Sequence, residues 1–132
     1  QAAVDTRIYP LFRISSPGGV LEVRDSNISS QNKILNIHDI CFYLDSQNQQ
    51  VENSPAVYVQ STFINGFSTA FQNNILGRFY LERSVIKNTH NHALNISNPY
   101  VLEIKECTIE NTLKSCVNLR FSLELLLIKE KF

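Results

Sequence analysis

Four residues with side chains suited to binding or catalysis recur at one place in an alternating pattern of apolar and polar residues. They are two carboxylates and two phenols: Glu22, Tyr58, Tyr80 and Glu103. Each stands between two apolar residues, as Glu22 does between Leu21 and Val23. In a strand, this places it on the face opposite to its apolar neighbours. The tyrosines are suited to stacking on a sugar ring, and the carboxylates to acid–base chemistry on a glycosidic bond.

The charged residues further along the same pattern argue against catalysis. Their spacing places Glu82 beside Lys105 and Arg83 beside Glu106 on neighbouring copies of a repeat. Opposite charges at matched positions are an ordinary way to stabilise neighbouring strands. A hydrolase instead needs an acid and a base on either side of one bond, and a calcium-dependent lyase needs several convergent oxygens. We therefore predict no catalytic residues, and two roles stay open for the four: carbohydrate binding or an ordinary surface ladder.

An internal repeat sets all of these positions. Five apolar residues recur 23 residues later: Phe79, Leu81, Ile86, Leu94 and Ile96 correspond to Leu102, Ile104, Ile109, Val117 and Leu119. The pattern extends back by 22 residues to Val57, Val59 and Ile64. Alternation over a few residues predicts strands, and a fixed period of this length is typical of solenoids. A unit this short buries its apolar face only by stacking on copies of itself.

The stacking predicts which side chains meet along the axis. Ile86 should be buried against Ile109, and a column of amides should run through Asn36, Gln72, Asn95 and Asn118. Amides stacked at the strand spacing hydrogen-bond to one another. We therefore predict an all-β fold, a parallel β-helix of about four to five rungs of 22 to 23 residues each.

Short motifs within the repeat resemble those of known β-helix proteins. They are the Gly18-Gly19-Val20-Leu21 start and a bend of the form Ser/Thr-x-Ile/Phe-x-Asn, as in Ser61-Thr62-Phe63-Ile64-Asn65. From about Gly18 to Phe121 the chain resembles the right-handed parallel β-helix repeats of the pectin-lyase-like fold, and in particular repeats of polymorphic surface proteins. The resemblance implies a right-handed coil. Proteins with this fold include polysaccharide lyases and large surface proteins, so the resemblance leaves the function open.

The repeat divides the chain into three parts. Residues 1–17 do not fit it and are expected to form an N-terminal cap segment. Residues 18–123 are expected to form the β-helix, with an insertion at 40–55 that includes a polar, Gln-rich loop. Residues 124–132 are expected to form a C-terminal strand or an assembly segment.

The C-terminal segment is the predicted contact with another polypeptide. Leu125 and Leu127 follow Leu102 and Ile104 by 23 residues, so they should begin a further rung. A β-helix that stops there presents an apolar end unless something covers it. We therefore expect Leu125, Leu127 and Ile128 to contact a neighbouring copy or the continuation of a longer β-helix.

Composition excludes several classes of partner. Lys plus Arg and Asp plus Glu each number 12, so the formal net charge is zero. With no basic excess, we expect no nucleic-acid partner. No apolar run reaches about 18 residues, so we expect no membrane span in this chain. The sequence contains no Met, which indicates a processed chain or a piece of a longer one.

Cysteine and histidine give no clear site. The odd number of cysteines, 3, argues against a complete disulfide framework. Cys107 falls in a column of small residues, so we interpret it as a small core filler, and a Cys107–Cys116 disulfide across one rung is the alternative. His90 and His92 lie in a polar bend with no visible third ligand, so we predict no metal and no cofactor.

Two sequons bear on localisation. Asn27-Ile28-Ser29 and Asn95-Ile96-Ser97 would allow glycosylation at Asn27 and Asn95 in a secreted protein. The leading hypothesis is a non-enzymatic structural or interaction module of an extracellular or cell-surface assembly, which binds other protein chains and forms filaments by end-to-end stacking. The alternative is a carbohydrate-binding or polysaccharide-cleaving protein of the pectin-lyase-like type, with a glycan as its partner.

Overall fold

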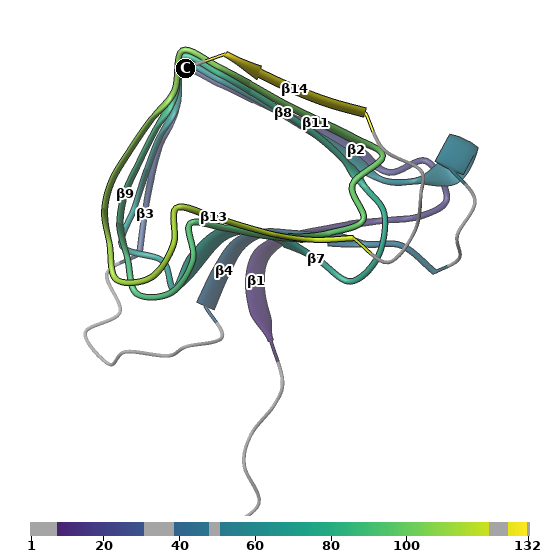
Figure 1. Ribbon diagram of the computed structural model, residues 1–132, viewed down its shortest axis with the longest axis horizontal. Helices are drawn as coiled ribbons and strands as arrows, with labels where there is room; N and C mark the ends of the chain where they lie inside the picture. Colours follow the sequence, from purple (N-terminus) through teal and green to yellow (C-terminus); the bar gives the residue numbers. More distant parts are fainter. Residues whose placement is uncertain (1–7, 31–38, 48–50, 122–126, 132) are drawn as a thin grey trace, which may run out of the picture.

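The strands of the computed structural model form three parallel sheets that wrap around one core, as the three sides of the outline in Figure 1 show. The structure describes residues 8–30, 39–47, 51–121 and 127–131, the last of these by its backbone alone. Sheet A contains β1 (Tyr9–Ser15), β4 (Asp39–Asp45), β7 (Thr69–Asn73), β10 (Leu94–Ser97) and β13 (Val117–Arg120). Sheet B contains β2 (Val20–Arg24), β5 (Ala56–Gln60), β8 (Arg78–Glu82), β11 (Val101–Lys105) and β14 (Leu127–Lys131). Sheet C contains β3 (Asn27–Ser29), β6 (Phe63–Asn65), β9 (Val85–Thr89) and β12 (Thr108–Thr112).

The chain passes through sheets B, C and A in turn and then starts the next rung. The first rung is β2, β3 and β4, the second β5 to β7, the third β8 to β10, and the fourth β11 to β13. Every strand pairs in parallel with its equivalent in a neighbouring rung, and Leu102 lies opposite Phe79 as the 23-residue spacing predicts. The all-β fold and the parallel β-helix are therefore confirmed.

The core is built from the inward column of each sheet. In sheet A, the rings of Phe12, Phe42 and Phe71 stack with centroids 5.3 and 4.9 Å apart. Phe79 of sheet B meets Phe71 edge to face at 6.5 Å, which joins two sheets across the interior. In sheet C, Ile86 is buried as predicted, whereas Ile109 opposite it is only partly buried. In the described part of sheet C, the fourth rung thus covers the third without being covered itself, whereas in sheet B β14 pairs with β11 of the fourth rung.

The predicted amide column is confirmed for Gln72, Asn95 and Asn118, and it is wrong at Asn36. Asn118 donates its side-chain N–H to the Asn95 oxygen at 3.0 Å, and Gln72 lies opposite Asn95. Tyr43 of β4, not Asn36, lies opposite Gln72. Asn36 itself lies outside the described residues. The triplet Leu35-Asn36-Ile37 reads like Leu94-Asn95-Ile96, so the sequence offered a false match just before the true strand.

The interpretation of residues 40–55 as one insertion also needs correction. Residues Asp39–Asp45 form β4, a regular strand of sheet A between β1 and β7. Two connections are longer than in the other rungs: the stretch after β4, with the short 3-10 helix η1 (Val51–Asn53), and the connection before it, with nine residues between β3 and β4 against three between β6 and β7. At the N-terminal end, β1 belongs to the coil because it pairs with β4 over its whole length. The first seven residues lie outside the described part of the chain.

The C-terminal segment forms a strand, as expected, but in a different register. Ile128 lies opposite Leu102, and Glu130 lies opposite Ile104. The 23-residue spacing predicted instead that Leu125 would lie opposite Leu102 and that Leu127 would lie opposite Ile104. Leu125 lies outside the described residues. The spacing fails because six residues separate Arg120 from Leu127, against three between β10 and β11. A longer connection delays the next strand.

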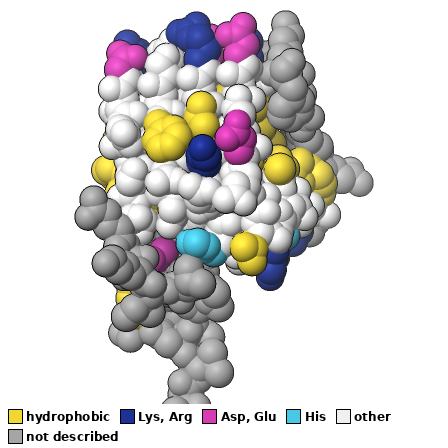
Figure 2. Space-filling view, turned by 90° about the vertical axis from the view of Figure 1, so that its left-hand side faces the viewer, with side chains coloured by type: hydrophobic (Ala, Val, Ile, Leu, Met, Phe, Trp, Pro, Cys, Tyr) yellow, Lys and Arg dark blue, Asp and Glu magenta, His cyan; other side chains and the backbone are white. Residues whose placement is uncertain are grey.

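The corner between sheets B and C repeats one turn in every rung. The first corner residue lies in the left-handed region of backbone space, with φ from 46° to 53°, at Asp25, Ser61, Arg83 and Glu106. The next residue bonds back to the carbonyl two residues earlier, at Ser26, Thr62, Ser84 and Cys107. Along the upper edge of the face in Figure 2, acidic and basic side chains stand side by side. The second residue of this turn bonds to the backbone through a short side chain in every rung, which explains the column of small residues that contains Cys107.

A second amide ladder runs along sheet C. Asn88 donates to the side-chain oxygen of Asn65 at 2.7 Å, and Asn111 donates to that of Asn88. Asn88 and Asn111 also have positive φ values of 58° and 56°, which Asn tolerates better than most residues. The ladder therefore fixes a bend in β9 and β12. No helix among the described residues is long and apolar enough to cross a membrane.

Candidate functional site

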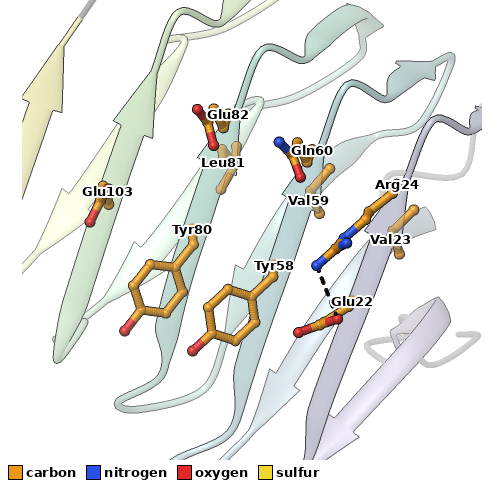
Figure 3. A pocket seen from close by; sticks show the side chains of 10 residues that line it. All are labelled: Glu22, Val23, Arg24, Tyr58, Val59, Gln60, Tyr80, Leu81, Glu82 and Glu103. Atoms are coloured by element: carbon orange, nitrogen blue, oxygen red, sulfur yellow. Dashed lines mark ion pairs between the residues drawn. The ribbon is translucent and has the colours of Figure 1, made fainter.

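The structure brings the four predicted site residues into one row on the outer face of sheet B. Glu22 lies opposite Tyr58, Tyr58 opposite Tyr80, and Tyr80 opposite Glu103, on β2, β5, β8 and β11. Figure 3 shows the two rings side by side between the two carboxylates. The row follows from strand alternation, because the apolar neighbours of each residue point into the core.

The two tyrosines form a parallel stack. Their ring centroids are 4.3 Å apart and their planes differ by 1°. Burial, and then the neighbouring Tyr58, raise the pKa of Tyr80 above its ordinary value. The hydroxyl of Tyr80 therefore stays protonated at neutral pH and can donate a hydrogen bond. Each ring already covers one face of the other, so a ligand can reach only the outer faces and the edges.

The groove around this stack is shallow. It encloses about 120 Å³, less than the roughly 300–1,000 Å³ of sites that enclose a small molecule. Its floor and walls come from four strands of sheet B: Glu22, Val23, Arg24, Tyr58, Val59, Gln60, Tyr80, Leu81, Glu82 and Glu103. Such a groove suits a flat contact with one side of a ligand, as on an extended chain or on another protein.

The carboxylates of the groove are paired with nearby cations. Glu22 lies 3.6 Å from Arg24, and Glu103 lies 3.8 Å from Lys105, both along the same strand. Lys105 is opposite Glu82 in register, as predicted, but Glu82 pairs with Arg83 at 3.2 Å. The ion pairs expected between rungs at these positions are thus replaced by pairs within a rung. A long side chain reaches two residues along a strand as readily as across to the next one.

The spacing of Glu22 and Glu103 does not suit glycoside cleavage. They are three strand spacings apart, roughly 14 Å between backbones. Glycosidases need their two carboxyl groups about 5–9.5 Å apart, so that both reach one bond. Among the described residues, no group of three or more His, Cys, Asp and Glu side chains converges on a point that could hold a metal ion.

The Cys107–Cys116 disulfide, which was the alternative to a small core filler, is not formed. All three cysteines are free thiols: Cys41 is buried, Cys107 is partly buried, and Cys116 is exposed. The thiol of Cys107 donates to the Lys105 carbonyl at 3.3 Å, and the sulfur of Cys116 lies 3.9 Å from the Thr112 hydroxyl. The two side chains belong to different corners of the rung, because β12 separates them.

The two sequons differ in access. Asn27 is exposed on β3, at the edge of sheet C, and its side-chain oxygen accepts a hydrogen bond from Ser29 at 3.2 Å. Asn95 is half-buried and its oxygen is engaged by Asn118. Of the two predicted glycosylation sites, Asn27 is the more accessible.

Residues at the ends of the coil were missed by sequence reasoning. Leu11 of β1 and Val20 of β2 are each 56 % exposed, and Phe121 after β13 is 47 % exposed. Leu127 and Ile128, predicted as assembly residues, lie on β14 at the end of sheet B. Alternation was the signal available in the sequence for Leu11 and Val20, since their neighbours Phe12 and Leu21 face the core and they therefore lie on the outer face.

Comparison of the chain with protein-family models, with curated proteins and with solved structures finds no match in any of the three.

Proposed function

We propose that this chain is a non-enzymatic structural module that binds other protein chains through the ends of its coil. The partly exposed core residues of sheets C and A at the C-terminal end carry the proposal. In the third rung, Ile86, Leu94 and Ile96 are at most 1 % exposed. Their equivalents in the fourth rung, Ile109, Val117 and Leu119, are only partly buried. A solenoid needs a polar cap or a further chain at such an end.

The N-terminal end supports the same proposal. Phe12, Leu21, Val23 and Ile28 pack against the core from the first strands but stay partly exposed. The exposed Leu11 and Val20 border the same end, along a shallow hollow between β1 and β2. Apolar strands at the edge of a sheet are sites of pairing with other chains unless charges or caps protect them.

The finer parts of the proposal concern family and location. The right-handed coil of the pectin-lyase-like fold is the hand that parallel strand crossovers strongly favour. An accessible sequon at Asn27 and the resemblance to surface-protein repeats support an extracellular or cell-surface assembly, in which the module carries glycan. Expression through a secretory pathway tests this part: glycan should attach at Asn27, and Asn27→Gln should remove it.

Amide hydrogen exchange on the dilute chain tests whether the ends are open. Exchange of the β9 and β10 amides should require unfolding of the coil, because both strands are paired on two sides. Amides of β13 that do not bond to β10 should exchange orders of magnitude faster. Equally slow exchange throughout β13 in a monomer would show that the end is covered within the chain, and the proposal would be wrong.

Carbohydrate binding at the tyrosine stack is the second candidate function. The observation that favours it is the row itself, two coplanar rings with a carboxylate at each end. Aromatic rings contact the apolar faces of sugars, and carboxylates accept hydrogen bonds from their hydroxyls. The open groove would suit an extended glycan on the coil surface.

Titration with neutral and acidic oligosaccharides, followed by NMR chemical shifts, tests this candidate. Binding at the row predicts shifts in β5 and β8 that Tyr58→Ala and Tyr80→Ala abolish. Tyr100→Ala, which changes a half-buried tyrosine outside the groove, is the matched control and should leave them intact. Shifts that persist in both groove variants would show that the oligosaccharide does not bind at the tyrosine row.

A further inference from the structure

We propose that the partner at the coil ends is a second copy of this chain, stacked head to tail so that β13 pairs with β1 and β14 pairs with β2. This inference rests on the proposed function and names its partner. It starts from the stepped shape of the two ends. Among the described residues, sheet A has its first strand one rung before the other sheets, with β1, and sheet B has its last strand one rung after them, with β14.

The two steps are complementary. In the described part of the chain, sheets A and B each contain five strands. A copy displaced by five strand spacings, roughly 24 Å, therefore continues both sheets without a gap. Sheet C contains four described strands, so the junction leaves one strand position open there. Two of the three sides of the coil would hold the contact.

The register in sheet A brings apolar residues together. Following the pairs along the sheet, Val117 lies opposite Leu94, Leu94 opposite Phe71, Phe71 opposite Phe42, and Phe42 opposite Phe12. On the free edge of β13, the residue opposite Val117 would therefore be Phe12 of the second copy. Two residues further on, Leu119 would meet Ile14. The partly buried apolar residues at the end of one core would cover those at the facing end of the other.

The register in sheet B adds apolar and charged matches. Leu127 occupies the column of Val20, and Ile128 that of Leu21, so both pairs are apolar. Lys129 occupies the column of Glu22 and Glu103. At the junction it would stand between Glu103 of its own chain and Glu22 of the next. Opposite charges on neighbouring strands favour pairing.

Two positions at the junction oppose the contact. Glu130 occupies the column of Ile104 and Val23, whose other members are core residues, so a carboxylate would face the core margin of the second copy. Lys131 occupies the column of Arg24 and would lie beside it in the second copy. Like charges directly opposite each other destabilise strand pairing. This mismatch makes the register testable in both directions, because one charge reversal should weaken the contact and another should strengthen it.

The contact is heterologous, since one end of the coil binds the other end of the next copy. Such a contact leaves a free end on every complex and produces an open filament unless a rotation closes it. The proposed assembly is thus a continuous β-helix whose strand ladders pass from copy to copy.

Charge reversal, followed by analytical ultracentrifugation, tests the register. Lys129→Glu should weaken self-association by about tenfold, and Lys131→Glu should strengthen it by a similar factor, given the usual size of cross-strand charge pairs. Glu22→Lys combined with Lys129→Glu should restore association. Lys87→Glu, the same change on sheet C away from the junction, is the control and should have no effect.

A cysteine pair gives a second and independent readout. In the proposed register Asn118 lies beside Arg13 of the next copy, within the roughly 4–7 Å between Cα atoms that a disulfide needs. Within one copy the two are four strand spacings apart, roughly 19 Å. Oxidation of the Arg13→Cys, Asn118→Cys double variant should therefore yield a ladder of covalent multimers. Each single variant, with the three native thiols present, is the control.

The outcomes separate this inference from the proposed function. Association without the 13–118 cross-link, or without the opposite effects of the two charge reversals, would overturn the register. A monomer with fast-exchanging β13 amides would overturn self-stacking and leave a different protein as the partner. A monomer with protected β13 amides would overturn both.

Discussion

Ile86 of β9 lies directly opposite Ile109 of β12, yet only Ile86 is fully buried. The difference is one of position, because a further rung would have to cover Ile109. Ile86→Ala should therefore cost about 2–5 kcal/mol of unfolding free energy, as buried Ile to Ala changes do. Ile109→Ala should cost clearly less in the dilute chain. Urea unfolding measures both, and a loss within measurement noise for Ile86→Ala would contradict the rung alignment.

The asparagine ladder should contribute to stability through both its side chains and its backbone. Asn88 accepts a hydrogen bond from Asn111, donates one to Asn65, and has a φ of 58°. Asn88→Ala removes both bonds and adds backbone strain, so it should cost about 1–3 kcal/mol. Asn88→Gly removes the bonds without the strain and should be the milder change. Thermal unfolding of the two variants decides this, and a milder alanine variant would argue against the strain.

Stability should fall at alkaline pH. Burial and the neighbouring Tyr58 raise the pKa of Tyr80 in the folded chain, and burial and Asp45 raise that of Tyr43. Because the folded chain holds these protons more tightly than the unfolded chain, their stabilising effect is complete below the unfolded-state pKa of about 10. It is lost as the pH rises through the folded-state pKa. Melting temperatures from pH 8 to 11 should therefore decline less steeply in Tyr80→Phe, and superimposable curves would contradict the assignment.

Polysaccharide cleavage should be absent. The chain should not turn over pectin-like or other acidic polysaccharides, with or without calcium, because Glu22 and Glu103 are too far apart to flank one bond. Release of reducing or unsaturated ends is the assay. Turnover that disappears in Glu22→Gln or Glu103→Gln would show that the row is catalytic after all.

The sequence predicts this fold well where the connections between strands keep a constant length. Ile86 and Ile109, or Asn95 and Asn118, pair as the 23-residue spacing requires. The prediction fails at Asn36 and Leu125, each of which falls in the sequence of a longer connection, between β3 and β4 and between β13 and β14. Alternation shows which face of a strand is apolar, but not which of two similar apolar runs forms the strand.

The candidate site was predictable in part for the same reason. The row of Glu22, Tyr58, Tyr80 and Glu103 follows from alternation and register alone. The ion-pair partners do not, since the choice of Arg83 for Glu82 over Lys105 depends on side-chain conformation at the corner. The sequence also predicted an apolar C-terminal end, but not which core residues of the fourth rung stay partly exposed, because that depends on which strands pair beyond them.

Sedimentation of the isolated chain across a concentration series tests the central claim most directly. Open coil ends that bind each other predict species that grow in size from low to high micromolar concentration, with no plateau at a dimer. They also predict protection of the β13 amides as the species grow. A monomer at high micromolar concentration whose β13 amides are already protected would contradict the account, because the end of the coil would then be capped within the chain.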